Sequence, residues 1–286
     1  MQTKKKVSVS DVLASKAKEK LAVLTAYDYS TATICDRAGT DILLVGDSAS
    51  MVVLGHASTV PIGMNEMLIF CNAVSKGAKR AMVVGDMPFG SYQPSNSLAL
   101  ENAVRLVKAG CDAVKLEGGS EKAETVKALV DSGIPVMGHI GLKPQTSSLW
   151  EGYRVQGKTS KSAMNLMQDA KALQAAGAFS IVLEMVTSEV AAEITGSLDI
   201  PTIGIGSGTQ CDGQVLVLHD MLGIYEDIKP KFVKRYAELS RVISEAVSRY
   251  SVDVKAGQFP EESNTFHMDA DEALLFREKV GRSKSK

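Results

Sequence analysis

Eight short apolar runs follow one another along this chain from Leu21 to about residue 220, with longer stretches of helical spacing between them. Most runs are nearly continuous in Val, Ile, Leu and Ala and lack strict apolar–polar alternation, which is typical of parallel strands buried on both faces. The expected strands are Leu21–Thr25, Asp41–Val45, Ala81–Val84, Asp112–Leu116, Pro135–Gly138, Ser180–Leu183, Pro201–Ile205 and Gln214–Leu218. Strands that alternate with helices favour an α/β protein with a parallel sheet.

The stretches between these runs predict helices that end at glycine. Asn65–Lys79 and Asn96–Ala109 each place their apolar residues on one side of a helix. One pattern occurs three times: a helix ends at Ala-Gly, an apolar run follows, and an acidic residue comes next. It is found at Arg37–Asp47, Lys108–Glu117 and Ala175–Glu184. Eight such β/α units without a long linker predict a single TIM-type (β/α)8 barrel over residues 1–286, with a doubly wound open sheet as the alternative.

Three segments do not fit the regular β/α repeat. Residues 206–213 alone join the last two strands, whereas a parallel crossover usually needs about a dozen residues or more, so we expect one helical turn at Thr209–Gly213. Val9–Lys20 predicts an extra helix that covers the bottom of the barrel. Residues 230–280 predict a C-terminal helical extension, with a long amphipathic helix at Phe232–Tyr250 and a shorter one from about Ala270.

The composition excludes several classes of function. A net charge of −1 gives no general attraction for nucleic acid or anionic membrane. No apolar run approaches the roughly 20 residues that cross a bilayer, and no apolar region follows the basic cluster Lys4–Lys6, so we expect neither a membrane span nor a secretory signal. The cysteines form no C-x-x-C pair and are expected to be buried free thiols in a reducing cytoplasm. They are Cys35, Cys71, Cys111 and Cys211.

Four acidic residues stand at or just past the ends of expected strands: Asp47, Asp86, Glu117 and Glu184. In barrels of this type the chemistry sits at the C-terminal mouth of the strands, so these side chains should face one opening. Their oxygens suit Mg²⁺ or Mn²⁺ better than zinc or copper. Each Asp alone could instead be a helix N-cap. As a set they predict an acidic, metal-binding active site.

Side-chain direction supports this interpretation on the fourth strand. Lys115 and Glu117 are two residues apart and point to one face, toward the barrel axis, while Val114 and Leu116 point toward the helices. Lys115 is then either half of a structural salt bridge or a contact to a ligand or substrate. Glu184 follows an apolar run, where desolvation raises proton affinity and suits a general base, unless it pairs with a basic residue.

Two further features are ambiguous. His139 either lines the pocket or is a hydrogen-bonded core histidine. Gly204–Gly208 resembles a phosphate-cradling loop, but a tight turn after a strand explains it equally well.

Several phrases, in this order and spacing, resemble the ketopantoate hydroxymethyltransferase family over almost the whole chain. They are Thr25–Asp28, Val45–Ser48, Gly55–His56, Asp86–Phe89, Val114–Gly119, Gly138–Leu142, Pro144–Gln145, Gly152–Gly157, Leu183–Glu184, Ile203–Gly206, Asp212–Val217 and His219–Asp220. The resemblance implies the barrel of the phosphoenolpyruvate/pyruvate group.

The resemblance also implies a set of site residues. One Mg²⁺ per subunit would be held at Asp47, Asp86 and Glu117. The 2-oxo acid would be contacted by Asp47, Ser48, Asp86 and Lys115. The position of the family's general base is Glu184.

The implied reaction transfers a hydroxymethyl group from 5,10-methylenetetrahydrofolate to 3-methyl-2-oxobutanoate through a Mg-stabilised enolate. Its product is 2-dehydropantoate, which is used for pantothenate and coenzyme A biosynthesis. The enzyme is expected to be cytoplasmic and a homo-oligomer, a decamer being common in the family. Two other functions stay open: a Mg-dependent C–C lyase that acts on a related 2-oxo acid, and a non-catalytic metal-binding barrel.

Overall fold

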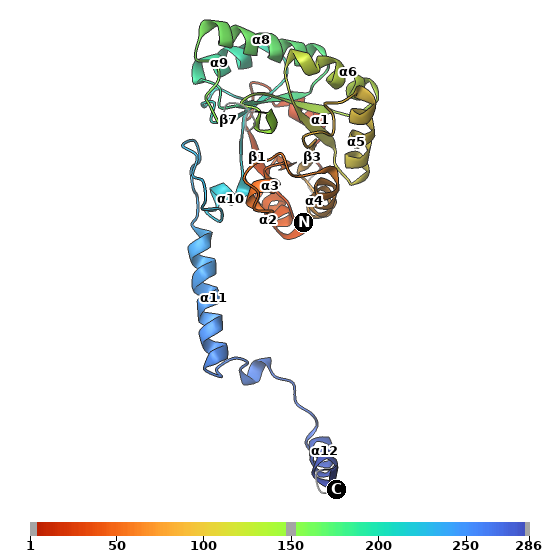
Figure 1. Cartoon of the computed structure of the whole chain (residues 1–286), viewed down its shortest axis with the longest axis vertical. Coiled ribbons are helices and arrows are strands. Elements are labelled where there is room, and N and C mark those ends of the chain that lie inside the picture. The colour runs from red at the N-terminus through yellow and green to blue at the C-terminus, as the bar shows by residue number, and fades with distance from the viewer. Residues whose placement is uncertain (1–4, 147–152, 284–286) are drawn as a thin grey trace. The chain divides into compact units, whose positions relative to one another are not determined.

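The computed structural model of the chain describes residues 5–146 and 153–283 (Figure 1). Lys4 and Gly152, named above, lie outside these residues. The chain forms two compact units, Met1–Ala237 and Glu238–Lys286. No helix among the described residues has the length and apolar character that crossing a membrane requires.

The first unit is a closed barrel in which each strand pairs in parallel with the next and β8 pairs with β1. The strands are β1 Leu21–Thr25, β2 Ile42–Val45, β3 Met82–Asp86, β4 Ala113–Glu117, β5 Val136–Gly141, β6 Ser180–Glu184, β7 Thr202–Ile205 and β8 Gly213–Leu216. All eight predicted strands are present, so the barrel prediction is confirmed and the open-sheet alternative is wrong. Strands β3, β4 and β6 end on Asp86, Glu117 and Glu184.

Helices surround the strands (Figure 1). In the barrel unit they are α1 Val9–Ala14, α2 Tyr29–Ala38, α3 Ala49–Val52, α4 Met64–Gly77, α5 Asn96–Lys108, η1 Ser120–Lys122, α6 Ala123–Asp131, α8 Ser160–Ala175, α9 Ser188–Ser197 and α10 Leu218–Met221. Their ends follow local side-chain chemistry. Asp28 caps α2 by accepting hydrogen bonds from the backbone N–H groups of Ser30 and Thr31, and Gly39 ends it in the left-handed conformation.

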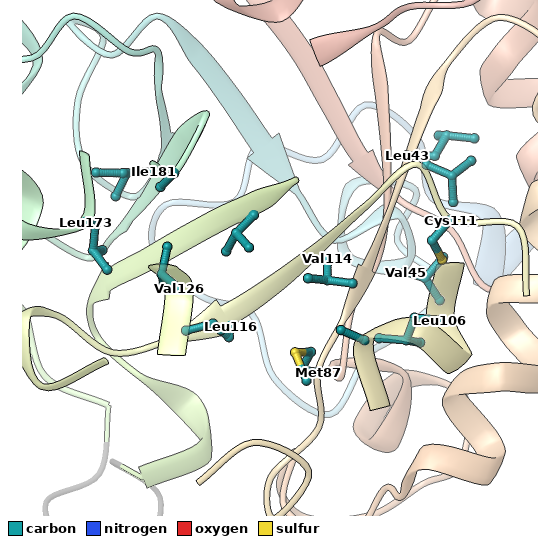
Figure 2. Packing of buried hydrophobic residues seen from close by; sticks show 14 of the residues in the cluster. Leu43, Val45, Met87, Leu106, Cys111, Val114, Leu116, Val126, Leu173 and Ile181 are labelled. Atoms are coloured by element: carbon teal, nitrogen blue, oxygen red, sulfur yellow. The ribbon is translucent and has the colours of Figure 1, made fainter. Parts of the chain in front are cut away.

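Two apolar layers hold the barrel together. One fills the space between strands and helices, and Figure 2 shows Val114 and Leu116 of β4 in this layer with Leu106 of α5. The other fills the barrel interior with residues such as Leu44 and Met137. Val114 and Leu116 therefore point outward as predicted, which leaves Lys115 and Glu117 on the inner face.

The N-terminal helix is shorter than predicted. It begins at Val9, where Ser8 and Asp11 form a capping box, and it ends at Ala14 because the following residues turn sharply through Ala17, whose φ is 55°. Val12 packs into the interior cluster beside Leu21, the first residue of β1. The predicted cover at the bottom of the barrel is confirmed.

The link between β7 and β8 has no helical turn, so the prediction at Thr209–Gly213 is wrong. Side-chain bonds to Asp212 fix this link instead. Its carboxylate accepts hydrogen bonds from the Thr202 backbone N–H at 2.9 Å, from Lys16 Nζ at 2.9 Å and from the Ala17 N–H at 3.2 Å. A short irregular link can therefore close the barrel.

The predicted long helix begins seven residues later than Phe232, because α11 spans Leu239–Lys255. Residues 222–238 form no helix or strand. The Phe232 side chain packs against the interior cluster instead of one helix face, and the Tyr236 N–H donates to the Met221 carbonyl. The second unit contains α11, η2 Glu262–Asn264 and α12 Ala270–Ser283, the last beginning where predicted. A single domain over the whole chain stays a prediction.

Candidate active site

The barrel brings the predicted site residues to one end. Asp47 and Ser48 follow β2, Asp86 ends β3, and Lys115 lies beside Asp86 in the register of β3 and β4. A cavity of about 340 Å³ opens here, and its walls include Asp47, Ser48, Asp86, Lys115, His139 and Glu184. Glu117 is buried and does not line this cavity among the described residues. Neither Asp is a helix N-cap, because Ser48 and Ser95 precede α3 and α5.

Lys115 and Asp86 form a buried ion pair. Lys115 Nζ lies 2.6 Å from Asp86 Oδ2, and both side chains are at most 5% exposed. Burial alone would lower the pKa of Lys115, but the carboxylates of Asp86, Asp47 and Glu117 outweigh it and raise that pKa above its ordinary value. The structural salt bridge considered above is therefore present, and it keeps a charged ammonium at the cavity wall.

Gln145 connects the acidic residues and carries a role that the sequence did not reveal. Its side chain is fully buried; the amide nitrogen donates to Asp47 Oδ2 at 2.9 Å and to the Met87 carbonyl at 2.9 Å. Its amide oxygen accepts a hydrogen bond from Tyr92 Oη at 2.8 Å, and its backbone N–H donates to Glu117 Oε2 at 3.1 Å. One residue thus fixes one oxygen of Asp47 and one of Glu117. Only the Pro144–Gln145 phrase pointed toward it.

The site has too little positive charge for its carboxylates. Burial, and next the charge of Asp86, raise the pKa of Asp47 to about 7. Burial and the charge of Asp47 hold the pKa of Glu117 well above its usual range. Lys115 acts in the opposite direction on both groups without offsetting these effects. A bound cation would relieve this repulsion.

The donor atoms fit a hard divalent cation. Asp86 Oδ1 and Glu117 Oε1 are buried and have no hydrogen-bond partner. Within residues 5–146 and 153–283, no three His, Cys, Asp or Glu side chains are grouped so that all could hold one ion. Mg²⁺ typically uses one or two carboxylates and retains several waters, so one or two of the three predicted residues could bind it directly and the others through water.

Glu184 is a carboxyl group that changes its protonation near neutral pH. Its side chain is 15% exposed. Burial raises its pKa to about 7, against the opposite effect of Lys115. The backbone around it is fixed, since its carbonyl accepts from the Leu142 N–H at 2.8 Å and the Met185 N–H donates to the Ile205 carbonyl at 2.8 Å. Met185 has a φ of 49°, an unfavourable conformation of the kind that clusters at functional sites.

His139 lies between two carboxylates. Its Nε2 atom is 3.2 Å from Glu184 Oε2, and its Nδ1 atom is 3.7 Å from Glu117 Oε1. Burial, and next the charge of Lys115, lower the pKa of His139 well below its ordinary value, so the ring is neutral. Neither ring nitrogen makes a hydrogen bond. His139 lines the cavity, as one of the two interpretations predicted, and its ring is almost completely buried there.

The Gly204–Gly208 segment makes a tight turn at the end of β7. Hydrogen bonds connect this turn to the end of β6. Gly206 and Gly208 have φ of 65° and 82°. Between them Ser207 Oγ donates to the Leu183 carbonyl at 2.7 Å and accepts from the Val186 N–H at 3.0 Å. The turn positions the backbone on either side of Glu184.

The remaining cavity walls come mostly from residues to which the sequence assigned no role in the site. They are mainly apolar or aromatic and lie on α3, on the connection before α8, and on the segment after α10. Examples are Met51, Tyr153, Tyr225, Ile228 and Phe232. Of these residues, Phe232 gave a detectable signal, but its spacing was interpreted as part of a helix face.

The chain matches known proteins over most of its length. The family model described as ketopantoate hydroxymethyltransferase matches residues 6–262. A protein of Nitrosopumilus maritimus named 3-methyl-2-oxobutanoate hydroxymethyltransferase is 55% identical over 96% of this chain and 99% of its own length. A protein of the same name from Cenarchaeum symbiosum is 58% identical over 90% of this chain and 98% of its own length.

Solved structures share the fold at low sequence identity. Phosphonopyruvate hydrolase aligns with a TM-score of 0.60 and 11% identity over 97% of both chains. A 2,3-dimethylmalate lyase of the PEP mutase/isocitrate lyase superfamily aligns with a TM-score of 0.56 and 12% identity over 95% of this chain and 98% of its own. These similarities confirm the predicted barrel fold.

Proposed function

This chain belongs to the ketopantoate hydroxymethyltransferase family, and from that premise we propose that it transfers a hydroxymethyl group from 5,10-methylenetetrahydrofolate to 3-methyl-2-oxobutanoate. The product would be 2-dehydropantoate, for pantothenate and coenzyme A biosynthesis. The enzyme is a hydroxymethyltransferase by its family. The one-carbon donor, the metal and the roles of the site residues are what we propose.

The observation that carries the proposal is Glu184, a carboxyl group of pKa about 7 in the same cavity as the Lys115–Asp86 ion pair. A general base works best when its pKa lies near the working pH. Glu184 would accept the C3 proton of the 2-oxo acid, and the fixed backbone on both sides would hold its carboxylate in place. Lys115 and Ser48 would contact the acid, since both line the cavity.

Asp47, Asp86 and Glu117 would hold one Mg²⁺ per subunit. When bound, the ion would supply a Lewis acid that polarises the keto oxygen of the substrate. The chain's own contribution is to orient the carboxylates. Gln145 fixes Asp47 and Glu117, while Lys115 fixes Asp86.

We also propose a location and an assembly state. We expect the enzyme to act in the cytoplasm as a homo-oligomer, with the decamer common in the family as the first candidate. Exposed apolar residues on α11, such as Val247 and Tyr250, support an oligomer.

Proton exchange tests the assignment of Glu184. In heavy water with Mg²⁺ and without the folate donor, the wild type should exchange the C3 proton of 3-methyl-2-oxobutanoate. Glu184→Gln should abolish this exchange but bind the 2-oxo acid with nearly unchanged affinity, because the amide keeps the shape and loses the basic oxygen. Glu189→Gln, an exposed residue of α9, is the matched control.

Normal exchange by Glu184→Gln would show that another residue is the base. Exchange by the wild type without any donor-dependent product would instead indicate a lyase that acts on a related 2-oxo acid. Exchange that persists after removal of divalent cations would contradict the role proposed for Asp47, Asp86 and Glu117.

A further inference from the structure

The cavity is larger and more apolar than a short branched 2-oxo acid requires. Cavities of roughly 300–1,000 Å³ accept drug-sized ligands, and this one measures about 340 Å³. The acidic end of the cavity supplies the side chains that we assign to the 2-oxo acid and to Mg²⁺. The other walls form a second surface, which we call the outer wall: Tyr153, Asp220, Tyr225, Ile228 and Phe232.

The outer wall is built mostly from one segment of the chain. Asp220 belongs to α10, and Tyr225, Ile228 and Phe232 follow it without helix or strand. The Phe232 ring lies against Gly206, where an added Cβ would come within 3.0 Å of the ring. The Arg235 guanidinium donates to the Tyr225 carbonyl at 3.4 Å. The Phe232 contact holds the segment against the end of β7, and the Arg235 hydrogen bond connects two parts of the segment.

Asp220 is the carboxylate of this wall. Burial raises its pKa to about 6, against the opposite effect of Arg235, so it is ionised at neutral pH. Among the described residues, no side chain or backbone N–H donates a hydrogen bond to its carboxylate. A half-buried carboxylate on an apolar wall favours a ligand that presents N–H donors.

The outer wall adjoins the acidic end through Tyr27. The Tyr27 hydroxyl lies 2.8 Å from Ser48 Oγ, and its ring centroid is 5.4 Å from that of His219, the residue before Asp220. Burial raises the pKa of Tyr27, and the negative charges of Asp220 and Asp47 raise it further. Two molecules that occupied the two ends would therefore be neighbours, as group transfer requires.

We infer that the outer wall binds the pterin ring of the one-carbon donor, with the Asp220 carboxylate accepting hydrogen bonds from its aminopyrimidinone edge. This edge carries two adjacent N–H donors, which match the two oxygens of a carboxylate. Tyr225 and Phe232 give the flat ring aromatic contacts. Lys231, which also lines the cavity and is exposed, suits the anionic glutamate tail of a folate. The inference rests on the proposed function.

Binding of two probes tests the inference apart from catalysis. Tetrahydrofolate and a tetrahydropterin without the p-aminobenzoylglutamate tail are titrated calorimetrically into protein with Mg²⁺ and 2-oxo acid. Asp220→Asn should weaken both probes by the same factor, about 10- to 100-fold, because it removes a charged acceptor and presents an N–H group to the ring. Lys231→Gln should weaken tetrahydrofolate alone.

The controls come from the same segment. Asp227→Asn changes an exposed carboxylate that does not line the cavity, and it should bind both probes like the wild type. Tyr225→Phe should keep binding whereas Tyr225→Ala should lose it, because the ring and not the hydroxyl makes the contact. Thermal unfolding of each variant shows that it is folded.

Each outcome decides the inference. Asp220→Asn that binds both probes as tightly as the wild type overturns it while the proposed function stands. The Asp220→Asn variant could instead slow C3 proton exchange as strongly as it weakens tetrahydrofolate binding. That result would place Asp220 among the proton-transfer groups and would also overturn the inference. If the wild type exchanges the C3 proton but binds neither probe, the folate donor is wrong and the inference falls with it.

Discussion

At the scale of single residues, the site is defined by carboxylates whose pKa values lie far above their ordinary range. Asp47 and Glu184 both have a pKa of about 7, and burial is the largest cause for each. Removing water from a carboxylate disfavours its charge. Function keeps these groups buried at a cost in stability, which can be measured.

The pH dependence of stability should report the ionisation of Glu184. Its pKa is about 7 in the folded protein and near 4.5 when unperturbed. A raised folded-state pKa contributes stability that is complete below about pH 4.5 and is lost as the pH rises through 7. In metal-free protein, Glu184→Gln should therefore be more stable than the wild type by about 3 kcal/mol at pH 8 and by little at pH 5.

Urea unfolding at both pH values, with a chelator present, measures this difference. A stability gain that is equal at pH 5 and pH 8 would mean that Glu184 does not titrate in this range. Glu189→Gln is again the control, because Glu189 is exposed.

Gln145 should control metal affinity although it is not a proposed ligand. Gln145→Met keeps the approximate shape and removes the amide bonds to Asp47, Met87 and Tyr92. Loss of residues that orient ligands typically costs about 10- to 100-fold in metal affinity. Calorimetric titration with Mg²⁺ measures the change, and Gln168→Met, on the exposed face of α8, is the control. Unchanged Mg²⁺ affinity in Gln145→Met would limit Gln145 to a structural role.

At the scale of elements, the strands could be predicted because continuous apolar runs define them. The acidic residues could be placed because Asp86, Glu117 and Glu184 end such runs. Gln145 could not be placed, since a neutral amide in a loop has no periodic signal and its partners lie on other elements. The predicted start of the long helix was wrong for a related reason. Phe232 lines the cavity, and its apolar side chain matched a helical spacing by coincidence.

The short connection between β7 and β8 also depended on contacts that are distant in sequence. Asp212 is buried and pairs with Lys16, far away in the chain. The Lys16 hydrogen bond is the main favourable cause that lowers the pKa of Asp212, against burial. Local sequence alone therefore suggested a helical turn that the side-chain bonds make unnecessary.

Removing this ion pair should destabilise the barrel without changing the chemistry. Asp212→Asn should lower the free energy of unfolding by about 2 kcal/mol, less than for a fully buried pair because Lys16 is partly exposed. The rate of C3 proton exchange should stay at the wild-type value, since Asp212 does not line the cavity. A double-mutant cycle with Lys16→Met isolates the pair. Additive effects in this cycle would show that the ion pair contributes nothing.

At the scale of the whole molecule, the second unit carries an apolar stripe that it does not bury itself. The stripe runs along α11 through Ile243, Val247, Tyr250 and Val254, which are 44–58% exposed. None of the residues of α11 is buried. Contiguous exposed apolar surface of this kind marks an interface, which agrees with the expected homo-oligomer.

A charge in this stripe should weaken self-association. Val247→Lys should lower the molar mass measured by light scattering, since burial of an unpaired ammonium is costly. Ser248→Lys, also on α11, places the same charge at an exposed position about 100° around the helix from Val247 and serves as the control. The same mass for Val247→Lys and wild type would exclude the stripe from the oligomer interface.

The irregular segment from Leu222 to Ala237 has a consequence for how such enzymes diversify. It contributes Tyr225, Ile228 and Phe232 to the cavity, yet it belongs to no strand ladder. Insertions or replacements there would leave the eight-stranded scaffold and its proton chemistry in place. Grafting this one loop between relatives is therefore the most economical route to an enzyme that takes its carbon unit from a different carrier.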